Sequence, residues 1–375
     1  MRVLVAMSGG VDSSMTAALL VEQGHDLTGV HLKMAAAPTG PAGRTGKGCC
    51  TLDDARDARR VADRLAIPFY VWDLASAFTE RVVEDFVTEY AAGRTPNPCI
   101  RCNERVKYTA LLARARSVGF DALATGHHVR LRSDTDGRAR LYRAADRGKD
   151  QTYVLYMATQ QALAHTLWPV GEHTKAALRT MAAERGLPTA TKPDSHDICF
   201  IPSGDLRSFL APRLGERRGA FVGPNGAVLG FHDGAYRFTV GQRRGLGLGG
   251  QAEPLYVTAI HGSDVHVGPR SFLETHDLVA VNLSWVAGRP PPEGTALTAQ
   301  VRYRGAALPA EAVELGGGRI RVTFPAERPV GVAPGQAVVL YDGDECLGGA
   351  TIAHSPGGGT PEYATAPTWS GRKES

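Results

Sequence analysis

A Ser-Gly-Gly loop between an apolar strand and a helix has the residue types of a phosphate-binding site. Gly9 and Gly10 leave no Cβ in the way, so successive backbone N–H groups can converge on an anion at the positive end of the following helix. Serine hydroxyls add further donors: Ser8, Ser13 and Ser14. The Asp12 carboxylate should repel phosphate unless a magnesium ion carried by a nucleotide lies between them. The loop therefore predicts a nucleotide bound with its metal, and the alternative is an ordinary turn of a Rossmann-like sheet.

The cysteines are the second set of residues that could carry out chemistry. Six cysteines in 375 residues are too few for a disulfide scaffold, so we expect thiols in a reducing compartment. Cys99 and Cys102 form a C-x-x-C pair, and Cys199 follows the run Asp-Ser-His-Asp-Ile. Cys346 lies in a late apolar segment and is expected to be a small core residue.

An open α/β sheet would position both sets of residues. Short apolar strands alternate with helical patterns through the first half of the chain, as a doubly wound parallel sheet requires. His127 follows the fourth strand at its carboxyl end, where ligands of such sheets gather. We expect a hairpin at 130–143, and Gly24 is expected to end the first helix. The expected strands are 3–7, 27–32, 69–72 and 122–125, and the later helices are 53–66, 78–90, 104–118, 160–165 and 174–185.

The composition of the chain changes after residue 202. Helical patterns disappear, and short Val, Phe and Leu runs separated by Gly, Asn and Asp take over. We predict a catalytic domain at 1–203, a small central β-rich domain at 204–269, a C-terminal β-barrel at 270–354 and a disordered tail at 355–375. The barrel strands are expected near 298–303, 311–314, 320–324, 337–341 and 346–352.

Net charge and hydropathy predict where the protein is located, but they do not identify what it binds. The formal net charge is +4, from 42 Lys and Arg against 38 Asp and Glu, so binding of nucleic acid has to depend on local patches. No apolar run approaches about 20 residues, and nothing resembles a signal peptide. We therefore expect no membrane span and a cytoplasmic protein.

Several motifs resemble known families. The pattern Ser-Gly-Gly-Val-Asp-Ser resembles the PP-loop of the N-type ATP pyrophosphatases, whose domain is adenine nucleotide alpha hydrolase-like, and it is neither a Walker A loop nor a G-x-G-x-x-G fingerprint. The tRNA-specific 2-thiouridylases are similar at TPNPCIRCN (95–103), GHH (126–128), KDQTY (149–153), DSHDICFI (194–201), VGQRRGL (240–246) and PGQ (334–336). The resemblance implies a transferase that uses ATP with Mg²⁺ to replace the 2-oxygen of the wobble uridine of certain tRNAs by sulfur.

The resemblance also implies roles for single residues. Adenylation turns the uracil 2-oxygen into departing AMP, Cys199 carries the incoming sulfur as a persulfide, and Cys102 is the nucleophile that forms a disulfide with Cys199 after turnover. The implied ATP-binding residues are Ala6, Met7, Ser8, Gly9, Gly10, Val11, Asp12, Ser13, Leu32 and Gly126. The candidate tRNA-binding residues are Asn97, Cys99, His127, Lys149, Asp150, Gln151, Arg302, Tyr303 and Gln336, with Arg243 and Arg244 as further phosphate contacts. The implied partners are the tRNA anticodon stem-loop and, as sulfur donor, a cysteine desulfurase or a sulfur-relay protein.

Other readings of the same residues stay open. Some relatives carry Asp where this chain has Cys99, so Cys99, Cys102 and Cys199 could instead hold an iron–sulfur cluster; we favour the metal-free disulfide mechanism and assign no metal ligand. A structural zinc site is disfavoured, because it would need four ligands and these cysteines supply three. The rival functions are a small-molecule ligase of the argininosuccinate, NAD or GMP synthetase type, which has no need of paired cysteines, and a redox-sensing RNA-binding protein without catalysis. The complete loop and cysteine pair disfavour the latter.

Overall fold

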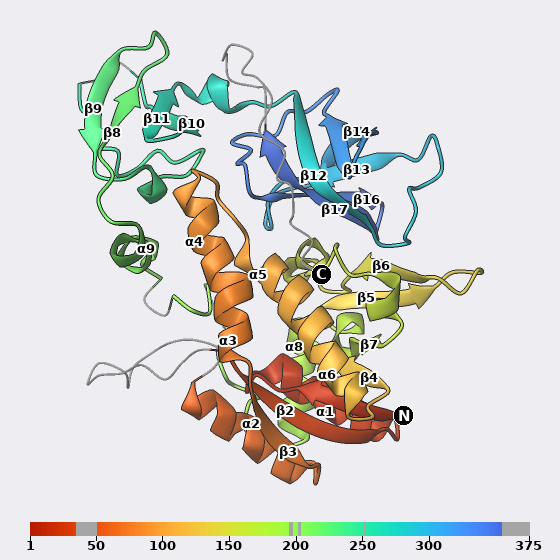
Figure 1. The fold of residues 1–375 in the computed structure, drawn as a ribbon. Coiled ribbons are helices and arrows are strands. Elements are labelled where there is room, and N and C mark those ends of the chain that lie inside the picture. The colour runs from red at the N-terminus through yellow and green to blue at the C-terminus, as the bar shows by residue number, and fades with distance from the viewer. Residues whose placement is uncertain (35–50, 195–197, 202–203, 251–252, 355–375) are drawn as a thin grey trace, which may run out of the picture.

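The computed structural model describes residues 1–34, 51–194, 198–201, 204–250 and 253–354. An α/β sheet forms one end of the molecule, and a small β-sheet and a β-barrel lie side by side at the other end (Figure 1). The predicted disordered tail at 355–375 lies outside the described residues. Among the described residues, no helix combines the length and apolar character needed to cross a membrane.

The first half of the chain folds around a parallel sheet whose described strands follow the order β3-β2-β1-β4-β7. These strands are β1 (Arg2–Ala6), β2 (Asp26–Lys33), β3 (Phe69–Asp73), β4 (Ala122–Ala124) and β7 (Thr166–Leu167). The central strand β1 pairs in parallel with β2 on one side, where Val3 lies opposite Leu27, and with β4 on the other. The predicted doubly wound parallel sheet is confirmed.

Alternate residues of β1 face two different layers of helices. Val3 and Val5 are completely buried in a cluster with the first layer, whereas Leu4 is buried in a second cluster with the helices between residues 75 and 117. Burial on both faces explains the unbroken apolar run of this strand. The first layer consists of α1 (Val11–Glu22), α2 (Leu52–Arg64) and α8 (Lys175–Glu184), and the short α7 (Gln160–Leu163) precedes β7. Gly24, at φ +78°, follows the end of α1 as predicted.

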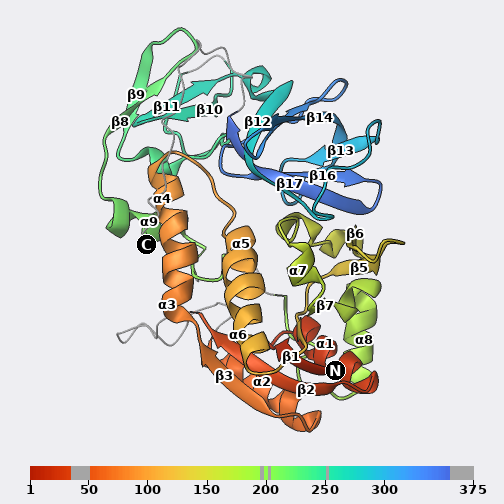
Figure 2. The ribbon, with the colours of Figure 1, turned by 45° about the vertical axis from the view of Figure 1, so that its right-hand side comes forward.

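Two helical columns rise from the sheet toward the β domains (Figures 1 and 2). The first contains α3 (Ala75–Phe78), a π-helical stretch (Thr79–Val83) and α4 (Glu84–Ala91), and the second contains α5 (Pro98–Arg101), a π-helical stretch (Cys102–Leu111) and α6 (Leu112–Ser117). The helices predicted at 78–90 and 104–118 are confirmed, but both begin earlier. Asn97 caps the second column by accepting a hydrogen bond from Cys99 N, and Pro98 occupies its first turn, so the C-x-x-C pair lies within a helix.

The segment after residue 202 contains a helix, so the expectation that helices disappear there is wrong. Asp205 accepts hydrogen bonds from the backbone N–H groups of Arg207 and Ser208 and caps α9 (Leu206–Leu214). The helix is short, and Pro212 lies inside it, which explains why the sequence pattern did not reveal it. A small sheet follows with the order β10-β11-β8-β9. Its strands are β8 (Gly219–Val222), β9 (Val228–His232), β10 (Tyr256–His261) and β11 (Asp264–Gly268).

The C-terminal strands close into a barrel in the order β12-β15-β14-β13-β16-β17, because β17 pairs back with β12. They are β12 (Asp277–Trp285), β13 (Leu297–Gln300), β14 (Leu308–Gly316), β15 (Arg319–Thr323), β16 (Ala337–Asp342) and β17 (Glu345–His354). The predicted barrel strands are confirmed, and β12 was missed. The predicted hairpin is also confirmed as β5 (Val129–Ser133) and β6 (Ala139–Arg143), but it pairs with β17 through Leu141 and Cys346 and so attaches the barrel to the first half of the chain.

Candidate active site

The Ser-Gly-Gly loop joins the carboxyl end of β1 to the N-terminus of α1. Gly10 is the N-cap of α1, and among the described residues no side chain caps the helix there, which suits an anion site at the helix dipole. Ser13 Oγ lies 3.1 Å from Ser8 N and 3.2 Å from Ser8 Oγ, so these serines face each other across the loop. Ser14 is fully buried, donates to Gly10 O and accepts from Thr189 Oγ1. Ser13 Oγ likewise donates to Gly10 O at 3.1 Å, so both hydroxyls have partners inside the protein, and their predicted role as phosphate donors stays a prediction.

Two glycines of the predicted ATP site are required by the protein's own backbone. Gly9 has φ +78°, and a Cβ there would overlap the backbone carbonyl of Asp54 at the start of α2. Gly126 follows β4 and packs against α1, where a Cβ would lie 2.7 Å from Ser13 N and 2.8 Å from Asp12 C. The sheet edge at the loop is thus too crowded for any side chain at either position.

The other predicted ATP-site residues line the strand ends beside the loop. Met7 N donates to Val30 O at 2.8 Å, which extends the β1–β2 pairing by one residue, and Leu32 is buried on β2. His31, which sequence reasoning missed, is buried with Nδ1 2.9 Å from Met7 O. The contacts of Met7 fix the start of the loop against β2. Ala6 ends β1 and Val11 begins α1, so these two residues flank the loop.

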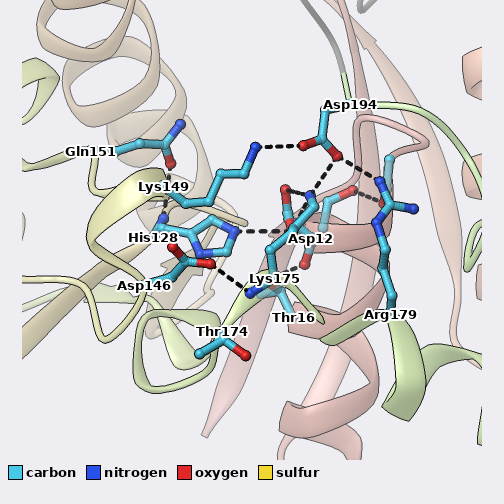
Figure 3. A network of polar contacts seen from close by, with 12 residues as sticks. Asp12, Thr16, His128, Asp146, Lys149, Gln151, Thr174, Lys175, Arg179 and Asp194 are labelled. Carbon is cyan, nitrogen blue, oxygen red and sulfur yellow. Dashed lines mark hydrogen bonds and ion pairs between the residues drawn. The ribbon is translucent and has the colours of Figure 1, made fainter. Parts of the chain in front are cut away.

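Asp12, in the first turn of α1, is held by a lysine and a histidine (Figure 3). Lys175 Nζ lies 2.8 Å and 2.7 Å from the two carboxylate oxygens, and His128 Nε2 lies 3.0 Å from Oδ1. Burial alone would raise the pKa of the Asp12 carboxyl, but hydrogen bonds and charge from His128 and Lys175 outweigh burial and lower this pKa. The carboxylate is therefore ionised, and Lys175 balances its charge beside the phosphate-binding loop.

The same lysine reaches Asp194, the first residue of the DSHDICFI motif (Figure 3). Asp194 Oδ1 lies 2.9 Å from Lys175 Nζ and 2.8 Å from Arg179 Nη2, and Oδ2 accepts from Lys149 Nζ at 2.9 Å. Burial opposes ionisation of Asp194, but hydrogen bonds from Lys149 and Lys175 hold its pKa far below the usual value. The network thus joins the PP-loop, the KDQTY motif and the DSHDICFI motif that contains Cys199.

Sequence reasoning missed Lys175, Arg179 and His128 as members of this network. Lys175 and Arg179 lie four residues apart on α8, a spacing that on a helix is typical of a solvated face. Only the packing of α8 against α1 turns this face toward the loop. His128 could have been found from the sequence. It belongs to the GHH motif and directly follows His127, which was predicted to lie at the carboxyl end of a strand.

His127 is buried in a network of aromatic and hydroxyl groups. Its Nδ1 lies 2.7 Å from Thr125 Oγ1 and 3.0 Å from Tyr108 Oη, and Trp168 Nε1 donates to both hydroxyls. Lys107 Nζ lies 3.5 Å from Nε2. Because an ammonium can only donate, Nε2 must accept, which places the imidazole proton on Nδ1. His127 is thus oriented by the protein interior, with Nε2 on the side of Lys107.

We expect the His127 imidazole to stay neutral in the folded protein at pH values where an unperturbed histidine is already protonated. Burial, with added repulsion from Lys107 and His128, lowers its pKa well below the usual value. Above about pH 6.5 this imidazole is neutral in both the folded and the unfolded chain. At lower pH only the unfolded chain takes up the proton, so the free energy of unfolding falls by up to about 1.4 kcal/mol per pH unit on acidification. NMR titration of ring-labelled histidines, assigned with His127→Gln, measures the midpoint. A His127 midpoint near the unperturbed value would contradict this buried, neutral arrangement.

The structure describes four cysteines, and no disulfide joins any of them. Cys102 is buried in the core cluster between the sheet and the helical columns, with Sγ 4.0 Å from Met34 Sδ. Cys199 is partly buried and packs against the same cluster, whereas Cys99 is exposed. Cys346 is completely buried in β17, and burial raises the pKa of its thiol, so the prediction of a core residue is confirmed.

Part of the predicted tRNA-binding set meets around Tyr303. The Tyr303 and Tyr153 ring centroids lie 5.9 Å apart, and the pKa of Tyr303 is raised by burial and by the nearby Cys99 and Asp150, while a hydrogen bond with Gln151 lowers it. Gln151 Oε1 also accepts from His128 N at 2.9 Å. The fold therefore brings residues of the TPNPCIRCN and KDQTY motifs together with the barrel.

Other predicted tRNA contacts have partners inside the protein. Asp150 accepts from Arg143 Nη1 at 3.0 Å and from Thr152 Oγ1 at 2.6 Å, and its side chain is only 7% exposed. Gln336 Nε2 donates to Thr95 O at 2.7 Å, two residues before Asn97. Their side chains thus hold neighbouring segments in place. Likewise, Arg302 donates to Gly331 O and connects two turns of the barrel domain.

Three family descriptions match the chain in succession. The tRNA methyl transferase HUP domain matches residues 1–203, the tRNA methyl transferase PRC-barrel domain matches residues 207–268, and the aminomethyltransferase beta-barrel domain matches residues 275–352. These matches cover the parallel-sheet domain, the small middle sheet and the closed barrel. They agree with the predicted α/β domain followed by two β units.

Curated relatives extend this likeness over almost the whole chain. The tRNA-specific 2-thiouridylase MnmA of Streptomyces avermitilis is 53% identical over 361 residues, which cover 94% of this chain and 95% of the relative. The protein of the same name from Thermobifida fusca is 51% identical over 358 residues, covering 95% and 96%. The crystal structure of a 4-thiouridine synthetase–RNA complex with bound ATP covers 57% of this chain and 50% of its own at 14% identity and a TM-score of 0.34, which is too low to carry a conclusion. From the family matches and the full-length relatives, the chain belongs to the tRNA-specific 2-thiouridylase family.

Proposed function

We propose that this protein catalyses ATP-dependent 2-thiolation of the wobble uridine of tRNA, as a tRNA-uridine 2-sulfurtransferase. The full-length likeness to relatives named tRNA-specific 2-thiouridylase carries the proposal. It is supported by a PP-loop with an open helix N-terminus and by two cysteines, distant in sequence, at one core cluster. Because the reaction needs tRNA and thiols, we place the protein in the cytoplasm.

Asp12 supports binding of ATP as its magnesium complex. Its carboxylate is ionised at the loop, and carboxylate oxygens are ligands that Mg²⁺ prefers. Bound Mg²⁺ would supply positive charge to the phosphates, which resolves the repulsion that Asp12 alone would cause. The residues that would contact the phosphates themselves are the N–H groups at Gly9 and Gly10 and the hydroxyls of Ser8 and Ser13.

The proposed reaction moves sulfur in balanced steps. The uridine 2-oxygen attacks the α-phosphate of ATP, and pyrophosphate leaves. The terminal sulfur of a Cys199 persulfide attacks C2, the bond from C2 to the adenylated oxygen breaks, and AMP departs. The Cys102 thiolate then attacks Cys199 Sγ, so the S–S bond to the transferred sulfur breaks, 2-thiouridine is released and a Cys102–Cys199 disulfide forms. An external thiol reduces this disulfide, and a cysteine desulfurase or a sulfur-relay protein supplies the next persulfide.

Reconstitution with purified components tests this function. The protein is incubated with tRNA transcripts, ATP, Mg²⁺, a persulfide donor and a thiol reductant, and digested nucleosides are analysed by mass spectrometry. We expect 2-thiouridine at the wobble position, in amounts that depend on both ATP and the donor. Nucleosides from cells that lack this protein provide the second readout, and unchanged wobble 2-thiouridine in those cells would refute the proposal.

The described residues give no support to the alternative iron–sulfur site. Among them, no group of three or more His, Cys, Asp and Glu residues could hold a metal ion. Cys99 is exposed at the start of its helix, whereas Cys102 is buried one turn later, so the two thiols have different surroundings. The disulfide route therefore remains our proposal.

We expect Arg244→Ala to weaken binding of all substrate tRNAs by a similar factor. Arg244 is exposed between the glycines of the VGQRRGL motif, where a guanidinium can reach a phosphate. Loss of one phosphate contact should reduce the slope of log K against log salt by about one. Filter binding over a salt series measures this slope. A slope equal to that of the unmodified protein would show that Arg244 is an ordinary surface residue.

A further inference from the structure

Lys175 lies at the meeting point of three segments that the proposed reaction uses. Its ammonium bridges Asp12 in the PP-loop helix and Asp194 at the start of the DSHDICFI motif, at distances between 2.7 and 2.9 Å (Figure 3). Its backbone N–H donates to Asp146 Oδ2 at 2.9 Å, and Asp146 caps the short helical turn that contains Lys149. The Lys175 side chain is only 11% exposed.

A lysine in this position costs free energy unless both of its carboxylate partners are present. Removing an ammonium from water is unfavourable, and a buried charge is retained where good geometry compensates it. Here Lys175 contacts both oxygens of Asp12 and one oxygen of Asp194. Because carboxylates on two different segments share one cation, the lysine fixes the distance between those segments.

Described residues on both sides of Cys199 are anchored, whereas residues 195–197 lie outside the described part of the chain. On the N-terminal side of Cys199, Asp194 is held by Lys175, and on its C-terminal side Phe200 packs in an aromatic cluster. The Phe200 ring centroid lies 5.7 Å from Phe78 and 5.2 Å from Phe86. The aromatic anchor ties the segment to the first helical column. The Lys175 bridge is the anchor that ties it to the ATP-binding loop.

We propose that Lys175 is a positioning residue that holds the Cys199 segment against the ATP-binding loop, so that adenylation and sulfur transfer act on the same uridine. This inference rests on the proposed function. An adenylated uridine that does not meet the persulfide reacts with water and returns uridine and AMP. The ATP is then consumed without thiolation. Lys175 therefore determines how tightly the use of ATP is coupled to the formation of 2-thiouridine.

Lys175→Met should uncouple the two steps while leaving both partial sites in place. Without the lysine, Asp12 keeps its contact with His128, and Asp194 keeps Lys149 and Arg179. Because a displacement of about 1 Å can cost on the order of 100-fold in rate, we expect 2-thiouridine formation to fall by about that factor. Pyrophosphate release should fall by a smaller factor, because Asp12 loses the charge balance from Lys175 but keeps its contact with His128 beside the loop. Pyrophosphate and 2-thiouridine measured in one reaction should change from a ratio near one to a ratio well above one.

Lys192→Met is the matched control. Lys192 lies two residues before Asp194 and also bridges two carboxylates, with Nζ 2.8 Å from Asp54 and 2.6 Å from Asp57. It does not contact Asp12, so its loss should leave the ratio near one even if stability falls. Lys175→Arg retains a bridging cation and should restore most of the coupling. tRNA affinity and persulfidation of Cys199 should be unchanged in all three variants.

Asp194→Asn removes the negative charge that pairs with Lys175 on the Cys199 side. This variant tests the positioning role if Lys175→Met does not fold. This variant leaves Lys175 paired with Asp12 and should also raise the ratio. If pyrophosphate release and thiolation fall together in Lys175→Met or Asp194→Asn, or if neither changes, the positioning role is refuted. The unmodified protein, measured beside them, tests the proposed function separately, because failure of that function means that it forms no 2-thiouridine at all.

Discussion

Cys199→Ser is expected to accept no sulfur from a persulfide donor, whereas Cys102→Ser is expected to become persulfidated at Cys199 and then fail to release 2-thiouridine. Each substitution removes an atom that forms a covalent bond in the proposed reaction, so thiolation should fall by about 1,000-fold or more in both. The variants differ because only Cys199 carries the incoming sulfur. Transfer of labelled sulfur to each protein, with location by mass spectrometry, measures the difference.

Cys99→Ser is the control for this pair. Cys99 is exposed and forms no covalent bond in the disulfide route, and serine keeps a polar side chain for the predicted tRNA contact, so this variant should retain most of the thiolation. Loss of activity together with bound iron would favour the three-thiolate cluster instead. Persulfide found on Cys102 in the Cys199→Ser protein would reverse the assigned roles of the two thiols.

Gly9→Ala is expected to lower kcat/KM for ATP by about 100-fold or more, since the added Cβ would overlap the Asp54 carbonyl and displace the loop. A left-handed φ also disfavours alanine, by roughly 1 kcal/mol. tRNA affinity should be unchanged, because the residue that the added Cβ would meet, Asp54, is not one of the predicted RNA-binding residues. Pyrophosphate release and filter binding give the two readouts.

Gly24→Ala is the control that separates the steric clash expected in Gly9→Ala from the cost of placing alanine at a positive φ. Gly24 has the same φ of +78°, but a Cβ there meets nothing within 4 Å among the described residues. This variant should lose roughly 1 kcal/mol of stability and retain full use of ATP. An equal loss of ATP use in both variants would mean that backbone strain, and not the crowded loop, explains the effect of Gly9→Ala.

The barrel, as well as the α/β domain, contacts the KDQTY motif. Arg143, on the hairpin that joins the barrel sheet, contacts Asp150 at 3.0 Å and Gln300 of β13 at 3.3 Å. Thr152 Oγ1 lies 3.2 Å from the Tyr341 hydroxyl on β16. A substitution at Asp150 therefore tests the attachment of the barrel as well as any contact with RNA, and it should be interpreted with a stability measurement.

The sequence by itself determined the elements and the kind of chemistry. The apolar run before the Ser-Gly-Gly loop predicted a strand buried on both faces. This was possible because the strands of a parallel sheet are covered by helices on both faces, so their sequences are continuously apolar. The motifs around Cys102 and Cys199 predicted a family that the full-length relatives confirm. The helix at Leu206–Leu214 was missed, since it is short and contains Pro212.

Only the tertiary structure decided which residues meet. Lys175 and Arg179 have the spacing of a solvated helix face, and the packing of α8 against α1 brings Lys175 to Asp12 and Asp194, which lie 182 residues apart in the chain as numbered. Gly126 was predicted to bind ATP, and only the structure shows that the backbone of Asp12 and Ser13 requires a glycine there as well. The predicted RNA contacts Asp150 and Gln336 proved to bind other parts of the protein. A sequence pattern states which groups are available, whereas their partners depend on contacts between distant segments, which local periodicity does not encode.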